Sequence, residues 1–166
     1  MERIEYHTVE NKVEWGQGPW VDEPDKIQWP DQATGLPCLI VRNHGGALCG
    51  YVGIQEGHPL FGKRYDHEDC YNLEAHGGLT FSDKCFGAEE DRSICHIPGA
   101  GEPDHVWWLG FDCAHCMDHA PAFEARYRVR HGESPTHPET KVVYRDVAYV
   151  TDQCQKLAEQ LARIQS

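Results

Sequence analysis

The densest group of chemically versatile side chains follows directly after a strongly apolar run. Val106 to Phe111 reads VWWLGF, and Asp112 to His119 reads DCAHCMDH. Six of those last eight positions carry a carboxylate, thiol or imidazole, which are groups that bind metals or transfer protons. The apolar run predicts a buried strand, and binding residues are often found where a rigid strand gives way to a loop. The sequence therefore predicts a site here without naming its reaction.

A zinc ion is one candidate for this segment. Cys113, Cys116 and His119 are spaced i, i+3 and i+6, so on a helix they would partly share one face. A closed structural zinc site needs a further ligand pair, and because the chain has no second CxxC, distant ligands would have to come from Cys85 or from the Cys95-His96 dipeptide. A redox role has less support because the thioredoxin-like βαβ context is missing. The plain alternative is an aromatic strand with partly buried cysteines beside it.

Two His-Gly-Gly turns, at residues 44–46 and 76–78, form a second candidate site. Glycines in such turns allow positive φ and close approach of the backbone to a ligand, and their N–H groups can cradle an anion. If both turns meet the 112–115 segment at one rim of the sheet, they line a functional cleft. In that cleft His76 would act as the base or a metal ligand, His115 as the acid or a ligand, and Asp112 would orient or ligate.

The ligand expected for this cleft is small and anionic, with a nucleotide as one candidate. Backbone donors with Lys63 and Arg64 would hold phosphate, and Tyr51 or Trp108 would stack on a base. For each of these residues the plain alternative is a turn histidine, a solvated cation or a core aromatic. The expected ligand-binding set comprises His44, Gly45, Tyr51, His58, Lys63, Arg64, Gly77, Gly78 and Trp108.

The composition limits the classes of partner. Fifteen Lys and Arg against 27 Asp and Glu leave a formal charge of −12, which opposes non-specific binding to nucleic acid or to anionic membranes. No stretch approaches the roughly 20 apolar residues of a membrane span, and the first ten residues contain no apolar run of signal-peptide length. We therefore expect a cytoplasmic protein whose eight cysteines are mostly reduced.

The pattern along the chain predicts a single α+β domain over residues 1–166, with an antiparallel or mixed sheet of about five strands. A long amphipathic helix over about 145–164 should pack on that sheet, because its apolar residues recur at helical spacing. Strands are expected at 3–9, 38–42, 47–54, 71–76 with 79–81, and 106–111. Residues 14–37 are expected to be irregular, 82–105 and 131–140 to be loops, and a short helical turn after Asp112 to stop near Pro121.

The chain also resembles a family of small hypothetical proteins encoded by bacteriophages and prophages, over about residues 15–162. The motifs that carry the resemblance are GYVG at 50–53, GHPLFGK at 57–63, HGGLT at 76–80, WWLGFDCAH at 107–115 and YRD at 144–146. The resemblance implies an accessory protein made in the host cytoplasm, and it brings no mechanism with it. Because Cys116 is less typical of the motif, the resemblance shifts weight from the CxxC to His58, His76, Asp112 and His115.

Three functions stay open from the sequence. The first is capture of a small anionic, nucleotide-like ligand, which would suit sequestration of a host defence signal. The second is an acid/base or metal-assisted hydrolase that uses His76, Asp112 and His115, with zinc as the candidate metal. The third is an acidic protein-binding inhibitor of a host enzyme, which the charge of −12 permits. The expected partner is accordingly a small molecule or a host protein, and a homo-oligomer stays open.

Overall fold

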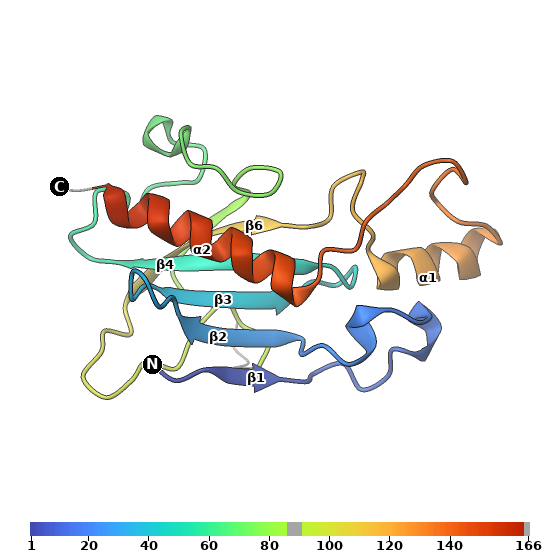
Figure 1. Cartoon of the computed structure of the whole chain (residues 1–166), viewed down its shortest axis with the longest axis horizontal. Helices are drawn as coiled ribbons and strands as arrows, with labels where there is room; N and C mark the ends of the chain where they lie inside the picture. The colour runs from blue at the N-terminus through green and yellow to red at the C-terminus, as the bar shows by residue number, and fades with distance from the viewer. Residues whose placement is uncertain (86–90, 165–166) are drawn as a thin grey trace.

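A six-stranded sheet forms the centre of the molecule, and all neighbouring strands in it are antiparallel. The computed structural model describes residues 1–85 and 91–164 (Figure 1). The strand order is β1-β2-β3-β4-β6-β5. The strands are β1 (Ile4–Tyr6), β2 (Lys26–Pro30), β3 (Pro37–Arg42), β4 (Leu48–Gln55), β5 (Phe81–Asp83) and β6 (Val106–Asp112). The helices are α1 (Pro121–His131) and α2 (Val147–Arg163), with short 3-10 helices η1 (Val13–Trp15), η2 (Pro19–Val21) and η3 (Glu68–Cys70).

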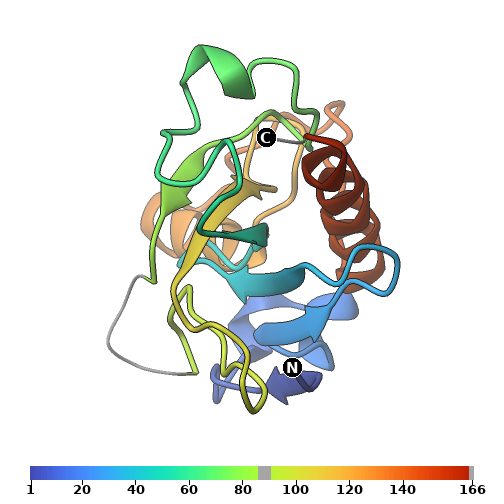
Figure 2. The ribbon, with the colours of Figure 1, turned by 90° about the vertical axis from the view of Figure 1, so that its left-hand side faces the viewer.

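The predicted α+β single domain with a C-terminal helix on the sheet is confirmed. Helix α2 lies along one face of the sheet (Figure 2), and its buried side chains come from the apolar stripe that the sequence predicts. Those buried residues are Val150, Cys154, Leu157, Ala158 and Leu161. Asp146 begins the helix, because its side chain accepts a hydrogen bond from the Tyr149 amide at 2.9 Å.

The glycine-turned hairpin is also confirmed, as β3 and β4 pair directly. Gly50 in β4 leaves space that side chains of β6 and α2 occupy. A Cβ atom at that position would overlap the Phe111 ring and lie 2.7 Å from the Cys154 sulfur of α2. The missing side chain therefore lets α2 settle on the sheet.

Several expected element boundaries are wrong. The segment 14–37 was expected to be irregular, yet it contains β2, in which Lys26 and Gln28 are buried together with Ile27. Polar residues at buried positions hide the apolar alternation that signals a strand. Residues 71–76 form turns and irregular structure instead of a strand, and the edge strand β5 begins later, at Phe81.

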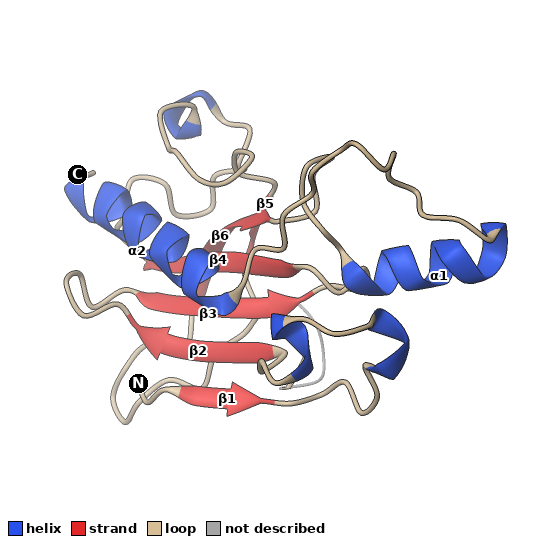
Figure 3. Ribbon diagram, turned by 45° about the vertical axis from the view of Figure 1, so that its right-hand side comes forward, coloured by secondary structure: helices blue, strands red, loops and turns tan. Residues whose placement is uncertain are grey.

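Pro121 does not end a helical turn as expected but begins α1. Proline suits the first helical position because its missing N–H would have no partner there. Helix α1 contacts η1 and lies beyond the ends of the strands (Figure 3).

The face of the sheet opposite α2 has its own small core. Leu39, Cys49, Tyr51, Val106 and Trp108 are buried there, with Phe81 and Ile94 packed against them.

A disulfide joins Cys85 to Cys95 in the neighbouring segment, which corrects the expectation of reduced cysteines at these two positions. Within residues 1–85 and 91–164, no helix combines the length and the apolar composition that crossing a membrane requires.

Candidate metal centre

Two histidines and a carboxylate from two separate loops meet beside the N-terminal end of α2. The ligand atoms of His76, His115 and Asp118 all lie within 4.8 Å of one another, and they form the one potential metal-binding group found among the described residues. His76 comes from the turn before β5, whereas His115 and Asp118 come from the loop after β6. The side chain of Asp118 is almost fully buried, that of His76 is 14% exposed and that of His115 is 36% exposed.

Asp118 is the centre of this cluster. Its Oδ2 atom accepts a hydrogen bond from His76 Nε2 at 2.7 Å and from the His115 backbone amide at 3.0 Å, and lies 3.3 Å from His115 Nδ1. Its Oδ1 atom accepts from Arg145 Nε at 3.0 Å. Burial by itself would raise the pKa of Asp118, but these hydrogen bonds outweigh burial and hold that pKa below its usual value. The carboxylate is therefore ionised, as a metal ligand must be.

The loop that carries His115 is held by its own carboxylates. Asp118 closes a turn on His115, because each backbone amide donates toward the other residue: Asp118 N to His115 O at 2.9 Å, and His115 N to the Asp118 side chain. At the start of the loop, Asp112 Oδ1 accepts from the Ala114 amide at 3.0 Å, and Asp112 Oδ2 accepts from Thr80 Oγ1 at 3.1 Å. Asp112 thus shapes the loop, and its Oδ1 atom lies 3.8 Å from His115 Nδ1.

The second His-Gly-Gly turn positions His76 and makes room for His115. Gly77 and Gly78 both have positive φ, at 68° and 86°. The His115 ring packs directly over Gly77, where a Cβ atom would overlap it. Glycine at position 77 therefore satisfies both the backbone conformation and the close approach of the two imidazoles, whose ring centroids are 5.5 Å apart.

Tyr149 in the first turn of α2 and Arg145 just before that helix supply two further contacts that the sequence did not suggest. Tyr149 Oη lies 2.8 Å from His76 Nδ1, and the Arg145 guanidinium, which is bonded to Asp118, lies over the Tyr149 ring at 4.8 Å. Because ionised Asp118 can only accept, His76 Nε2 carries the proton, and in neutral His76 the Tyr149 hydroxyl donates to Nδ1. No local sequence motif marks Arg145 or Tyr149. They reach the cluster because α2 packs on the sheet.

Two of the distances in the cluster can be compared with those in a zinc site. With ligand atoms about 2.1 Å from a tetrahedral zinc ion, neighbouring ligands lie roughly 3.4 Å apart. The 3.3 Å separation of His115 Nδ1 and Asp118 Oδ2 already fits this value, and the 2.7 Å contact of His76 needs a small outward movement once a metal replaces the shared proton. His76 would then carry its proton on Nδ1 and donate it to Tyr149 Oη, the kind of outer partner that metal-bound histidines usually have.

The CxxC is not part of this cluster. Cys113 is buried, and burial raises the pKa of its thiol, which disfavours the thiolate that zinc requires. Cys116 is exposed, and His119 Nδ1 is paired with Glu124 at 2.9 Å. The three residues expected as zinc ligands are therefore replaced as candidates by His76, His115 and Asp118. Asp118 belongs to the 112–119 segment in which the sequence predicts a site, but the role of the carboxylate was expected of Asp112.

The expected anion-binding residues are scattered over the molecule. Lys63 and Arg64 pair with Asp69 and Asp66 respectively. His58 accepts from the Leu60 amide through Nδ1 and donates through Nε2 to Leu161 O at 2.9 Å, so it holds the C-terminal end of α2. None of these three residues contacts the histidine cluster.

The two aromatic residues expected to stack on a base are in the core. Trp108 is fully buried, and Tyr51 is 8% exposed with its pKa raised by burial.

The first His-Gly-Gly turn, at residues 44–46, does lie close to the cluster on one side. Gly45 accepts hydrogen bonds from the first amides of α1 and lines a pocket with His115, while the carbonyl of His44 accepts from Arg126.

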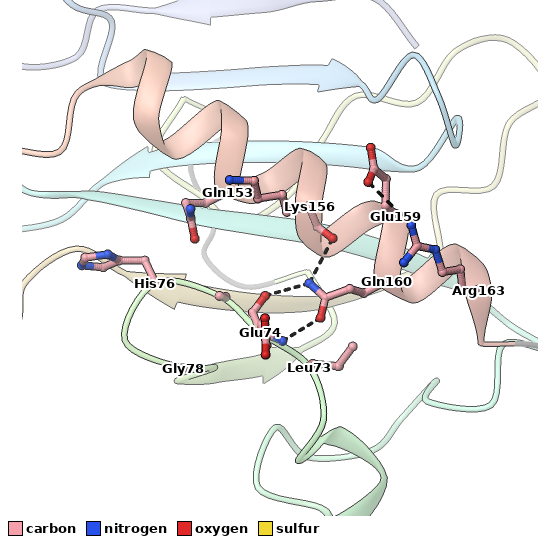
Figure 4. A pocket seen from close by; sticks show the side chains of 10 residues that line it. Leu73, Glu74, His76, Gly78, Gln153, Lys156, Glu159, Gln160 and Arg163 are labelled. Carbon is pink, nitrogen blue, oxygen red and sulfur yellow. Dashed lines mark hydrogen bonds and ion pairs between the residues drawn. The ribbon is translucent and has the colours of Figure 1, made fainter.

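Two hollows adjoin the cluster. A groove of about 730 Å³ runs between α2 and residues 73–78, with His76 at one end of it (Figure 4). Acidic, basic and amide side chains line this groove, among them Glu74, Lys156 and Gln160. A second pocket, of about 400 Å³, includes His115 and Asp118 in its wall. The candidate centre is thus reached from solvent on two sides.

Comparisons with protein-family models, with curated proteins and with solved structures found no match to this chain.

Proposed function

We propose that this protein is a metal-assisted hydrolase whose metal, zinc, is held by His76, His115 and Asp118. The observation that supports the proposal is the convergence of two imidazoles and one buried, ionised carboxylate within 4.8 Å. Catalytic zinc sites commonly use three protein ligands of these types and leave a fourth position open, whereas structural sites are closed by four. A zinc ion with such a position supplies Lewis acidity and activates water for attack on a carbonyl or phosphoryl group.

The surrounding residues favour a catalytic site over simple storage of an ion. Arg145 holds the second oxygen of Asp118 and Tyr149 holds the second nitrogen of His76, so that both ligands are oriented. The exposed edge of His115 leaves the cluster open to a small molecule. Tyr149, next to His76, is also a candidate proton carrier.

Zinc binding is tested by elemental analysis of the protein after zinc loading and desalting. We expect about one zinc per chain, and loss of most of it in His76→Ala, His115→Ala and Asp118→Asn. Cys116→Ala is the matched control, because it lies in the same loop but outside the cluster. Circular dichroism would show that each variant is folded. Retention of zinc by Asp118→Asn and His76→Ala, or its loss in Cys116→Ala, would refute the proposed site.

Hydrolysis is tested separately with zinc-loaded protein and a neutral chromogenic ester such as p-nitrophenyl acetate. The rate above background should vanish in Asp118→Asn and on treatment with a chelator, and should return when zinc is added to the wild-type chain. Equal rates for wild type and Asp118→Asn would leave a metal-binding protein without the proposed activity.

A further inference from the structure

The pocket of about 400 Å³ beside the candidate metal centre has the features of a substrate site. It lies between the 114–120 loop, the start of α1 and residues 135–142. His115 and Asp118, two of the three proposed ligands, form part of its wall. Its size is within the range of about 300–1,000 Å³ that is typical of small-molecule sites.

Much of the remaining wall is apolar. Phe123, Pro135 and Val142 line it together with the small residues Gly45, Ala114 and Ala120. Phe123 leaves 51% of its surface exposed, although it belongs to the first turn of α1. A large ring left open to solvent next to a hollow is suited to contact with an apolar group of a ligand.

The wall of the pocket contains neither a lysine nor an arginine, and the structure describes all of its lining residues. Glu124 is negative, and its oxygens are engaged by Arg128 at 2.6 Å and by His119 at 2.9 Å. Thr136 adds a neutral hydroxyl group. Phosphate and carboxylate ligands are usually held by Arg or Lys, so the part of the wall away from the proposed metal favours an uncharged group.

We infer that the pocket binds an uncharged carboxylic ester or amide, whose apolar group lies against Phe123, Pro135 and Val142. This inference rests on the proposed metal site, toward which the carbonyl of the substrate would be directed. Hydrolysis there forms a bond from the water oxygen to the carbonyl carbon and breaks the bond from that carbon to its oxygen or nitrogen leaving group. The water protons are shared between the leaving group and the released acid. No oxidant or further reactant is required.

The inference is tested with three probes that share one metal-binding group and differ in the charge of their para substituent. Benzohydroxamates that carry a para-methyl, para-carboxylate or para-aminomethyl group are titrated into zinc-loaded protein by calorimetry. We expect the methyl probe to bind tightest and the carboxylate probe about tenfold more weakly, since the wall offers the carboxylate no lysine or arginine. Phe123→Ala should lower the affinity for the methyl probe about tenfold, because apolar contact is lost. Val129→Ala, an exposed apolar position on the same helix, is the control and should change nothing.

The outcomes separate this inference from the proposed function. Equal or tighter binding of the carboxylate probe, or no effect of Phe123→Ala, overturns the substrate class even if zinc is bound stoichiometrically. Absence of zinc refutes the proposed function instead. The pocket is then judged on the metal-free protein by saturation-transfer NMR with benzyl alcohol and benzoate: preference for benzyl alcohol that depends on Phe123 supports the pocket, and no such preference overturns it.

Discussion

Tyr149 illustrates how single residues act at the candidate site. Its hydroxyl group lies 2.8 Å from His76 Nδ1, on the side of the ring that faces away from Asp118. This contact fixes both the orientation of the imidazole and the nitrogen that is free to bind a metal. Tyr149 is therefore a positioning residue for the proposed zinc ligand.

Tyr149→Phe removes the hydroxyl group and keeps the ring that Arg145 covers. We expect zinc to bind at the same stoichiometry but with roughly tenfold lower affinity or weaker, as is common when the outer partner of a metal-bound histidine is lost. Competition with a chelating dye measures this affinity. Tyr71→Phe, at an exposed tyrosine, should leave it unchanged. An unaltered affinity in Tyr149→Phe would show that the hydroxyl group does not orient His76.

Gly77 and Gly78 provide a matched pair for a second prediction. Both have positive φ, so that alanine costs about 1 kcal/mol of stability or somewhat more at either position. Only at Gly77 would the new Cβ overlap His115, because nothing lies within 4 Å of a Cβ at Gly78. We therefore expect both variants to unfold at lower urea concentration, but only Gly77→Ala to lose zinc. Zinc loss in both variants would mean that backbone strain, not the His115 contact, decides the geometry.

Helix α2 connects the core to the candidate site at the scale of elements. Its apolar stripe packs on the sheet, and residues at and before its first turn hold Asp118 and His76. The same docking that buries Val150 and Cys154 therefore brings Arg145 and Tyr149 to the two loops. The stability of the first turn of α2 and the arrangement of His76 and Asp118 should therefore change together.

Asp146→Ala tests the N-cap of α2. Loss of the bond from the Tyr149 amide should lower the free energy of unfolding by about 1 kcal/mol. Urea denaturation measures this change. Asp152→Ala removes an exposed aspartate of the same helix, which pairs with the exposed Lys156, and should cost about 0.5 kcal/mol or less. Equal losses in the two variants would contradict the capping role.

A buried ion network matters at the scale of the whole molecule. Asp25 is 2% exposed and pairs with Lys12 at 2.7 Å and with Arg42 at 2.6 Å, while the amides of Thr8 and Val9 donate to its second oxygen. Burial alone would raise the pKa of Asp25, but these partners outweigh it and lower the pKa below 3.8. The network joins the N-terminal segment to β3.

The lowered pKa predicts how stability depends on pH. Because the unfolded chain binds a proton to Asp25 at a higher pH than the folded chain does, the contribution of Asp25 is complete above about pH 4. It is lost as the pH falls through the lower folded pKa. Asp25→Asn should therefore flatten the decline in the free energy of unfolding below about pH 4. At pH 7 it should cost about 3 kcal/mol or more, because it leaves two buried cations unpaired.

Exposed Asp22 provides the control for this change. Asp22→Asn should follow the wild-type curve of unfolding free energy against pH, measured by urea denaturation from pH 3 to pH 7. If the free energy of unfolding of Asp25→Asn falls at low pH as steeply as that of the wild type, other carboxylates govern acid unfolding.

Local patterns determined much of the fold from the sequence alone. The stripe of α2 and the β3–β4 hairpin arise from the spacing of apolar residues and from glycine at a turn, both of which involve neighbours along the chain. The same patterns pointed to His76 and His115 as partners. They failed for β2, whose buried Lys26 and Gln28 find their partners only in the assembled structure.

Only the tertiary structure decided which groups complete the site. Asp112 and Asp118 are equally good ligands by type and both lie three positions from His115, so no spacing rule separates them. Asp118 is selected because Arg145 and His76, which are distant in sequence, reach it in the folded chain. Residue types and local periodicity therefore determined the elements and the candidate chemistry, whereas long-range packing of α2 and the 76–78 turn decided which residues form the candidate ligand set. Such contacts exist only once the sheet and helix have assembled, because the loops alone cannot bring these groups together.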